Sequence, residues 1–261
     1  MSWMDIRDNL GLSCHPSHIR DILASRGYHK CIPRRKWGIR VENQLKRVKW
    51  CQDRLGWGYD EWLRTVLCDE SYFSTAGFGS RPPVIRNAAE EYHPDCLDEV
   101  WESGSTGVMA WAAFCGHLKS DLVFVDGKVT INSEVYSTQI LDPHLIPFWH
   151  KTCEEYGWTQ VVEDGAPGHQ KHAIKLRLKN DVEVLSWCPQ SPDLNLIEAL
   201  WRDMESYLGK KYGRIADLNA LKHAVKEAWD QVGSERLEEL IKSMPDPLRA
   251  VIAANGGATR Y

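Results

Sequence analysis

The chain has 261 residues, enough for one large domain or for a domain of about 200 residues with a smaller one beside it. Its formal net charge of -4 averages two unlike regions, because residues 1–52 hold 11 Lys and Arg against 4 Asp and Glu, whereas acids outnumber bases in the rest. Eight cysteines without a C-x-x-C pair exclude a zinc ribbon and a dense disulfide framework, and no apolar run approaches the roughly 18 residues of a membrane span.

The basic region favours a polyanionic partner, because each Lys or Arg near a phosphate releases counterions condensed on a nucleic acid. A solvated charged surface is the alternative that charge alone leaves open. No signal peptide opens the chain and the cysteines are scattered. We therefore expect an intracellular protein of the nucleus or cytosol, neither secreted nor attached to a membrane.

Two short helices are predicted near the N-terminus, over 4–10 and 18–26. Their separation is that of a helix-turn-helix, in which His18 and Arg20 would face outward and meet base edges. Any small helical hairpin shows the same spacing, so the pattern alone is weak. The residues expected to face inward are Leu10, Ile19, Ile22 and Leu23.

A short basic arm follows these helices, where Arg34, Arg35 and Lys36 can straddle phosphates or enter a minor groove. A further basic helix is predicted over about 42–55, and the composition becomes acidic after it. We therefore assign residues 1–52 to a small all-α helix-turn-helix module with a basic arm. Residues 53–63 form a linker, and residues 64–261 form the larger domain.

The larger domain is predicted to be α/β, with a mixed sheet covered by helices on both faces, because strands come first and then alternate with helices. Strands are expected to end at Asp69 and to span 107–115, 121–125, 160–164 and 182–185. Helices are expected over 133–156 with a break near Asp142-Pro143, from Gly165-Ala166-Pro167 onward, and over about 194–209, 217–231 and 234–243.

Three acids from three of these elements, Asp69, Asp164 and Glu198, could converge on divalent cations, and such oxygen-rich clusters suit Mg²⁺ or Mn²⁺. Each acid also has a simpler explanation. Asp69 could belong to a turn and Asp164 could cap the helix that follows it. Glu198, at the margin of an apolar helix stripe, could pair with Arg202 one turn later.

The sequence around each acid carries a resemblance. The segments CDESYF from Cys68, EDGAPGH from Glu163 and SPDLNLIEALW from Ser191 resemble the three acidic boxes of the Tc/mariner transposases, which are DDE superfamily endonucleases. The match places the family's metal triad on Asp69, Asp164 and Glu198, with 33 residues between the last two. Residues 104–114 are similar to the family's glycine-rich strand and residues 10–50 to its second helix-turn-helix.

The chain departs from the family pattern in three places. It begins too late to hold the usual first helix-turn-helix, which bears on recognition of transposon ends. It has Gly165 where members often have Asn, and residues 81–86 replace a segment that commonly contains Trp and serves subunit contacts.

The resemblance implies a ribonuclease-H-like DDE catalytic domain over 64–261 that cleaves and transfers DNA strands with two Mg²⁺ or Mn²⁺ ions. It also implies double-stranded DNA partners, both transposon ends and target, and action as a homodimer. His169 would lie close enough to touch substrate phosphate, although a lone histidine is more often a packing residue. Asp193 and Asn195 are expected to shape the turn and cap the Glu198 helix.

Two other functions stay open at this point. A noncatalytic DNA-binding protein derived from a transposase would use the larger domain only as a scaffold. A metal phosphohydrolase for small molecules would need only the larger domain and would leave the basic region without a role.

Overall fold

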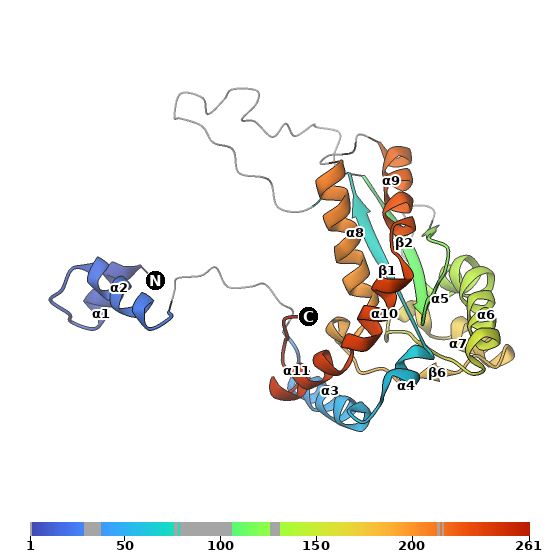
Figure 1. The fold of residues 1–261 in the computed structure, drawn as a ribbon, viewed down its shortest axis with the longest axis horizontal. Coiled ribbons are helices and arrows are strands. Elements are labelled where there is room, and N and C mark those ends of the chain that lie inside the picture. The colour runs from blue at the N-terminus through green and yellow to red at the C-terminus, as the bar shows by residue number, and fades with distance from the viewer. Residues whose placement is uncertain are drawn as a thin grey trace. The chain divides into compact units, whose positions relative to one another are not determined.

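The computed structural model describes residues 2–28, 38–75, 78, 106–125, 131–212, 215 and 217–261. The chain divides into two compact units, Met1–Gly38 and Ile39–Tyr261. This boundary lies earlier than the one predicted after residue 52, because helix α3 (Val41–Arg54) packs into the second unit against α11 (Pro245–Ala253) (Figure 1).

The first unit contains two helices, α1 (Trp3–Asn9) and α2 (Pro16–Ser25), close to the predicted ranges. Both helices begin with a side-chain cap: Ser2 accepts a hydrogen bond from the Asp5 amide, and the His15 ring accepts one from the Ser17 amide.

The expectation of four inward-facing residues in this unit was correct for Ile19 and wrong for Leu10 and Ile22. Ile19 is the one buried side chain among residues 2–28, while Leu10 is 66% exposed and Ile22 is 41% exposed. Two helices of seven and ten residues present too little surface to enclose more.

The second unit is built on a mixed six-stranded sheet in the order β3-β2-β1-β5-β6, with β4 also paired to β2. Strand β1 runs antiparallel to β2 and parallel to β5, which is parallel to β6. The strands are β1 (Thr65–Ser74), β2 (Gly107–Cys115), β3 (Leu118–Lys119), β4 (Val123–Val125), β5 (Gln160–Val162) and β6 (Val184–Leu185).

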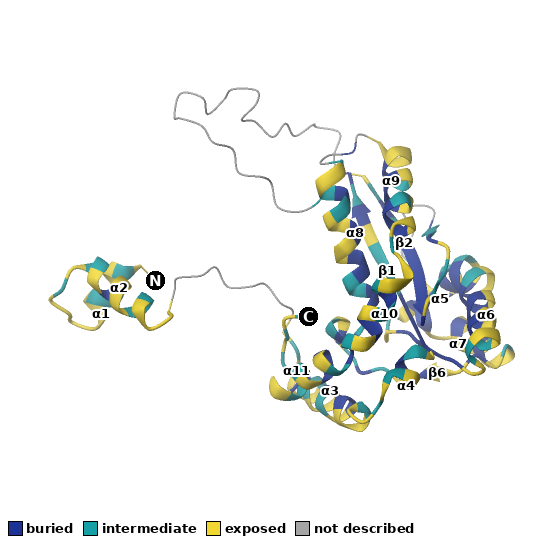
Figure 2. Cartoon of the chain, in the orientation of Figure 1, coloured by how far each residue is buried: buried dark blue, intermediate teal, exposed yellow. Residues whose placement is uncertain are grey.

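Helices cover both faces of this sheet, as predicted, and each face has its own apolar core (Figure 2). The α8-side core includes side chains from α3, α8, α9, α10 and α11, and the α6-side core includes side chains from α5 to α7. The helices not yet given are α4 (Tyr59–Leu63), α5 (Ser133–Tyr136), α6 (Ile146–Tyr156), α7 (His172–Lys179), α8 (Ile197–Lys211), α9 (Leu218–Asp230) and α10 (Ser234–Ser243).

Proline placement accounts for two differences from the predicted helices. Pro143 was expected to break the helix over 133–156, but it lies inside a π-helical stretch, Ser137–Leu145, that joins α5 to α6. Helix α11 was not predicted, and Pro245 occupies its first turn, where the missing amide proton costs nothing. None of the helices in the described ranges is both long enough and apolar enough to cross a membrane.

Candidate active site

Strand β1 presents two neighbouring acids to opposite faces of the sheet. Leu67 lies in the α8-side core and Cys68 in the α6-side core. Because side chains alternate along a strand, Asp69 points toward α8 and the adjacent Glu70 points toward α7. A single strand thus supplies an acid to each side.

The register of β5 brings Asp164 to the level of Asp69. Leu67 is paired with Val162 in the parallel ladder, and each acid follows its paired residue by two positions. Asp164 leaves the strand in a tight turn, because its carboxylate accepts a hydrogen bond from the Ala166 amide at 2.9 Å. Its side chain is 55% exposed, so it lies at the open end of the strand.

Glu198 lies in the first turn of α8, and its carboxyl group lies beside that of Asp69 on β1. The two carboxyl groups share a hydrogen bond. The side-chain amide of Asn195 donates to the Cys68 carbonyl at 3.1 Å, which ties the start of α8 to β1 one residue before Asp69. The structure therefore brings Asp69 and Glu198 together, with Asp164 on the neighbouring strand end.

The electrostatics of these acids differ because their surroundings differ. Burial, followed by the charges of Glu198 and Glu70, raises the pKa of Asp69 to about 8. Burial also raises the pKa of Glu198, against the hydrogen bond from Asp69 and the charge of Arg202. The hydrogen bond from His169 lowers the pKa of Asp164. Burial thus favours a proton on Asp69, which a cation could replace.

The expected contact of His169 with a substrate phosphate stays a prediction, and the structure places its ring, buried, beside Asp164. Its Nδ1 lies 2.8 Å from the Asp164 carboxylate, and its Nε2 lies 3.5 Å from Glu70. Burial lowers the pKa of His169, but the hydrogen bonds to Asp164 and Glu70 outweigh it and raise the pKa to about 11. The side chain of His169 is only 7% exposed, and its contact with the Asp164 carboxylate orients that carboxylate.

A buried ion pair supports this arrangement, and sequence reasoning did not identify it. Arg177 on α7 binds the Glu163 carboxylate and also donates to the His169 carbonyl at 2.7 Å. The Tyr136 hydroxyl donates to the other oxygen of Glu163. The signal in the sequence was the position of Arg177, which lies one turn after Ala173 on the inward face of α7.

The loop before α8 is held differently from the prediction. Neither Asp193 nor Asn195 caps α8, whose first residue follows Leu196 without a side-chain cap. Asp193 instead binds Arg47 through both carboxylate oxygens, at 2.8 and 2.7 Å. Arg202 donates to the backbone carbonyl of Glu198 at 3.3 Å.

The predicted DNA-contacting residues fall into two groups. His18 and Arg20 are exposed on α2, as a recognition surface requires, and Arg20 also pairs with Asp21 at 2.9 Å. Arg34, Arg35 and Lys36 lie outside the described residues.

Negative charge predominates around Asp69 at the centre of the site. The charges that raise the pKa of Asp69 come from Glu198, Glu70 and Asp164. Within the described ranges, no three His, Cys, Asp or Glu side chains are gathered closely enough to form a complete metal site. The donor set nevertheless fits hard divalent cations, since it consists of carboxylate oxygens in partial burial.

Comparison with known proteins gives consistent matches. Residues 121–222 match the family described as "DDE superfamily endonuclease". The chain is 30% identical over 244 residues to the Transposable element Tc1 transposase of Caenorhabditis elegans, a match that covers 93% of this chain and 87% of that protein. It is 27% identical over 264 residues to the Transposable element Tc3 transposase of the same organism, covering 98% of this chain and 75% of that protein.

Solved structures of the Mos1 transposase share the fold. A pre-cleavage Mos1 transpososome matches with a TM-score of 0.81 and 17% identity, covering 100% of this chain and 76% of that chain. The Mos1 mariner catalytic domain matches with a TM-score of 0.63 and 18% identity, covering 88% of this chain and 100% of that chain. The predicted ribonuclease-H-like mixed sheet flanked by helices is thereby confirmed.

Proposed function

The chain belongs to the Tc/mariner transposases, which are DDE superfamily endonucleases, and we propose that Asp69, Asp164 and Glu198 hold the divalent cations with which it cuts and joins DNA. The observation that carries this proposal is the hydrogen-bonded pair of Asp69 and Glu198, with Asp164 at the same level of the adjacent strand. Two acids held together in partial burial form a site whose negative charge a divalent cation would neutralise.

The ions, Mg²⁺ or Mn²⁺ and two in number, would activate the attacking hydroxyl and stabilise the charge on the leaving oxygen during in-line displacement at phosphorus. Asp69 and Glu198 would give up their shared proton to solvent and so offer two charged carboxylates. His169 would keep the Asp164 carboxylate turned to one side, through the 2.8 Å contact of its Nδ1. No side chain of the protein needs to act as a nucleophile.

DNA is the proposed substrate and partner, and we propose the nucleus as the place where the protein acts on it. Mos1 structures include a paired-end complex with the left transposon end and a strand transfer complex, which supports transposon ends and target DNA as ligands and a homodimer as the active form here. The 11 Lys and Arg of residues 1–52 would supply backbone affinity, although Arg47 is buried and makes no part of it.

Nicking of supercoiled plasmid DNA tests the proposal. We expect the full chain to nick with Mn²⁺ or Mg²⁺, and we expect Asp69→Asn and Glu198→Gln to stop nicking while DNA binding is retained. Asp142→Asn, an exposed acid on the helical stretch before α6, is the matched control and should nick at the wild-type rate. Nicking by both acid variants at the wild-type rate would disprove the assignment.

A noncatalytic, domesticated DNA-binding role is the second candidate, and the same assay separates it from catalysis. Wild-type protein that binds DNA in a salt-dependent manner but never nicks, with either metal, would establish that role. Binding that does not weaken as salt rises would argue against DNA as the partner in both cases.

A further inference from the structure

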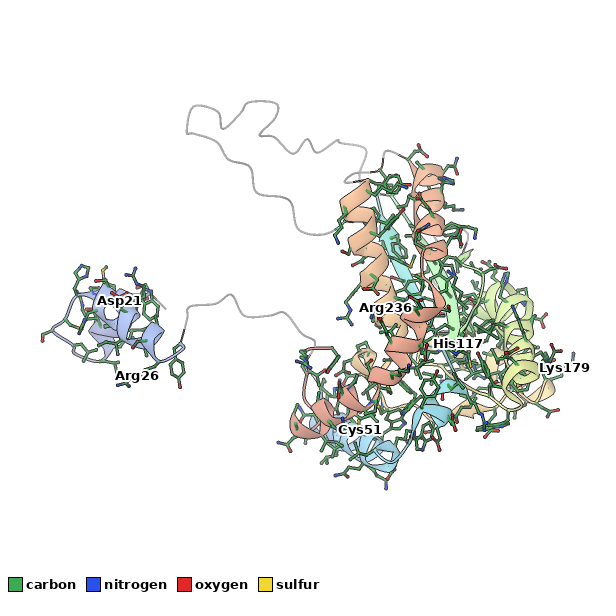
Figure 3. All side chains as sticks on the ribbon, in the orientation of Figure 1. Asp21, Arg26, Cys51, His117, Lys179 and Arg236 are labelled. Carbon is green, nitrogen blue, oxygen red and sulfur yellow. The ribbon has the colours of Figure 1, made fainter. Side chains whose placement is uncertain are left out.

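Arg47 is the most completely buried charged side chain in the described part of the chain, with 0% exposure. It lies on α3, one turn before Trp50 and Cys51, and all three side chains face the interior of the second unit, to which α3 belongs (Figure 3 labels Cys51). The sequence places it within a basic helix between two lysines, which suggested an exposed surface. Its position on the inward face of α3 shows that it has another role.

The guanidinium group of Arg47 directs most of its donors at one short segment of chain. Nη1 donates to the Gln190 carbonyl at 2.7 Å and to the Ser191 hydroxyl at 2.8 Å. Both terminal nitrogens bind the Asp193 carboxylate in a two-pronged pair, which is the geometry that only arginine provides. These three residues form the turn that leads into α8.

The remaining donor ties the same turn to the C-terminal segment. Nε of Arg47 donates to the Gly256 carbonyl at 2.9 Å, and the Thr259 hydroxyl donates to Asp193 at 2.7 Å. Gly256 can approach so closely because it lacks a side chain, since a Cβ there would lie 2.2 Å from the Gln44 carbonyl oxygen. Three distant parts of the sequence therefore meet on one arginine.

The held turn is connected directly to the acid pair. Leu194, which follows Asp193, is fully buried, and Asn195 then binds the Cys68 carbonyl beside Asp69. Glu198 begins its turn of helix with a hydrogen bond from its amide to the Asn195 carbonyl at 3.1 Å. The six residues from Asp193 to Glu198 thus have little freedom between two fixed points.

A purely stabilising role explains this arrangement poorly. Burying an ion pair removes two charges from water, so replacing such a pair by apolar side chains is often neutral for stability. What the pair does supply is a unique geometry for the turn. Removing the groups that orient metal ligands lowers the affinity for the metal. The effect of the ion pair should therefore be measured on metal binding.

We propose that Arg47 is the positioning residue of Glu198: by fixing the Gln190–Asp193 turn it sets the distance between the carboxylates of Glu198 and Asp69, and so the affinity of their cation site. This inference rests on the proposed function. It also gives α3, outside the matched range 121–222, a part in the reaction.

The test compares the full wild-type chain with Arg47→Met/Asp193→Asn, which removes both charges and keeps the approximate volumes. Mn²⁺ binding is measured by electron paramagnetic resonance of the free ion, nicking is measured on plasmid DNA, and unfolding is measured in urea. We expect cooperative unfolding and unchanged DNA affinity, with a Mn²⁺ Kd about 10-fold weaker and nicking about 10- to 100-fold slower.

Two further variants keep the result interpretable. Ile140→Ala, in the α6-side core, lowers stability without touching the turn, so its Mn²⁺ Kd and nicking rate should match the wild type. Arg47→Lys keeps the charge and gives up the two-pronged pair, and it should weaken Mn²⁺ binding by an intermediate factor. Should the paired variant lose cooperative unfolding, Arg47→Lys decides on the same readouts.

Two results would overturn the inference in distinguishable ways. Wild-type Mn²⁺ affinity and nicking in a folded Arg47 variant would remove the positioning role and leave the proposed function intact. A wild-type chain that neither binds Mn²⁺ nor nicks would remove the proposed function, and the positioning role with it.

Discussion

The carboxyl groups of Asp69 and Glu198 share a hydrogen bond between β1 and the first turn of α8, although they come from distant parts of the sequence. A hydrogen bond between two carboxyl groups requires a proton, and the burial of Asp69 favours keeping it. Without a bound cation, the folded chain therefore keeps a proton at this site that the unfolded chain would release at the same pH. This relationship makes both stability and metal binding depend on pH.

Asp69→Asn should stabilise the metal-free protein at alkaline pH. The pKa of Asp69 is about 8 in the folded chain, against roughly 3.9 when unfolded, so the folded chain binds the extra proton between these values. The free energy of unfolding must then fall as pH rises through this window. Urea unfolding in a chelator should show the variant more stable by about 5 kcal/mol at pH 8, and by about 1–2 kcal/mol at pH 5.

The control for this prediction is Asp142→Asn, whose exposed carboxyl should leave the pH dependence of unfolding unchanged. Equal loss of stability between pH 5 and pH 8 in the wild type and in Asp69→Asn would contradict the prediction.

Mn²⁺ should raise the melting temperature more at pH 8 than at pH 5.5, because the ion must displace the proton shared by Asp69 and Glu198. At an ion concentration 100 times Kd, the gain in unfolding free energy is about 2.7 kcal/mol. Glu198→Gln should reduce the gain, and Glu154→Gln, an exposed acid on α6, should not. A gain that is the same at both pH values would show that the ion binds elsewhere.

Replacing His169 by Ala should slow nicking by about 10- to 100-fold with DNA binding retained, because the Asp164 carboxylate loses the ring that orients it. His172→Ala is the matched control, since this nearby histidine is exposed at the start of α7. Rates are measured under single-turnover conditions with saturating DNA. If His169→Ala mainly weakened DNA binding, the histidine would contact the substrate after all.

Arg177→Met should destabilise the protein by about 3–5 kcal/mol, because Glu163 would remain buried without its partner. The paired variant Arg177→Met/Glu163→Gln should recover much of this loss. Lys226→Met, which breaks an exposed pair with Asp230 on α9, should cost about 1 kcal/mol or less. Urea unfolding gives all three values, and equal losses for Arg177 and Lys226 would refute the argument from burial.

Gly256→Ala and Gly157→Ala should separate backbone strain from close packing. Both glycines have positive φ angles, +78° and +82°, so both variants carry a strain of about 1 kcal/mol. Only at Gly256 would the new Cβ strike backbone, 2.2 Å from the Gln44 oxygen, whereas the space at Gly157 is open. The Gly256 variant should lose clearly more stability in urea, and similar losses would mean that α3 can shift freely.

Much of the second unit could be predicted from sequence because its signals are local. The strand over 107–115 was predicted at its observed limits, since an apolar run of that length is bounded by glycine and charge. The acidic boxes placed Asp69, Asp164 and Glu198 on three separate elements. Asp69 was predicted to end its strand, but it lies in the middle of β1, which continues to Ser74. The site residues remain a prediction until metal or activity is measured.

What the sequence could not predict are partners distant along the chain. Arg47 appeared to belong to a basic surface, because its charge suggested solvent and nothing nearby in sequence pointed to Asp193. The contact between His169 and Glu70 could not be predicted for the same reason, since Glu70 lies on β1, far from His169 in the sequence. Helix α11 was not predicted, although the first turn of a helix tolerates the proline that begins it.

Because α3 packs against α11, the second unit begins before the point in the sequence where the composition changes from basic to acidic. A fragment starting at residue 53, where the acidic composition begins, would lack Arg47 and leave the mostly buried Asp193 carboxylate without its charge partner. A fragment starting at Ile39 keeps every partner of that turn. Anyone separating the two halves of this protein should therefore cut before the third helix, where the chain is still basic.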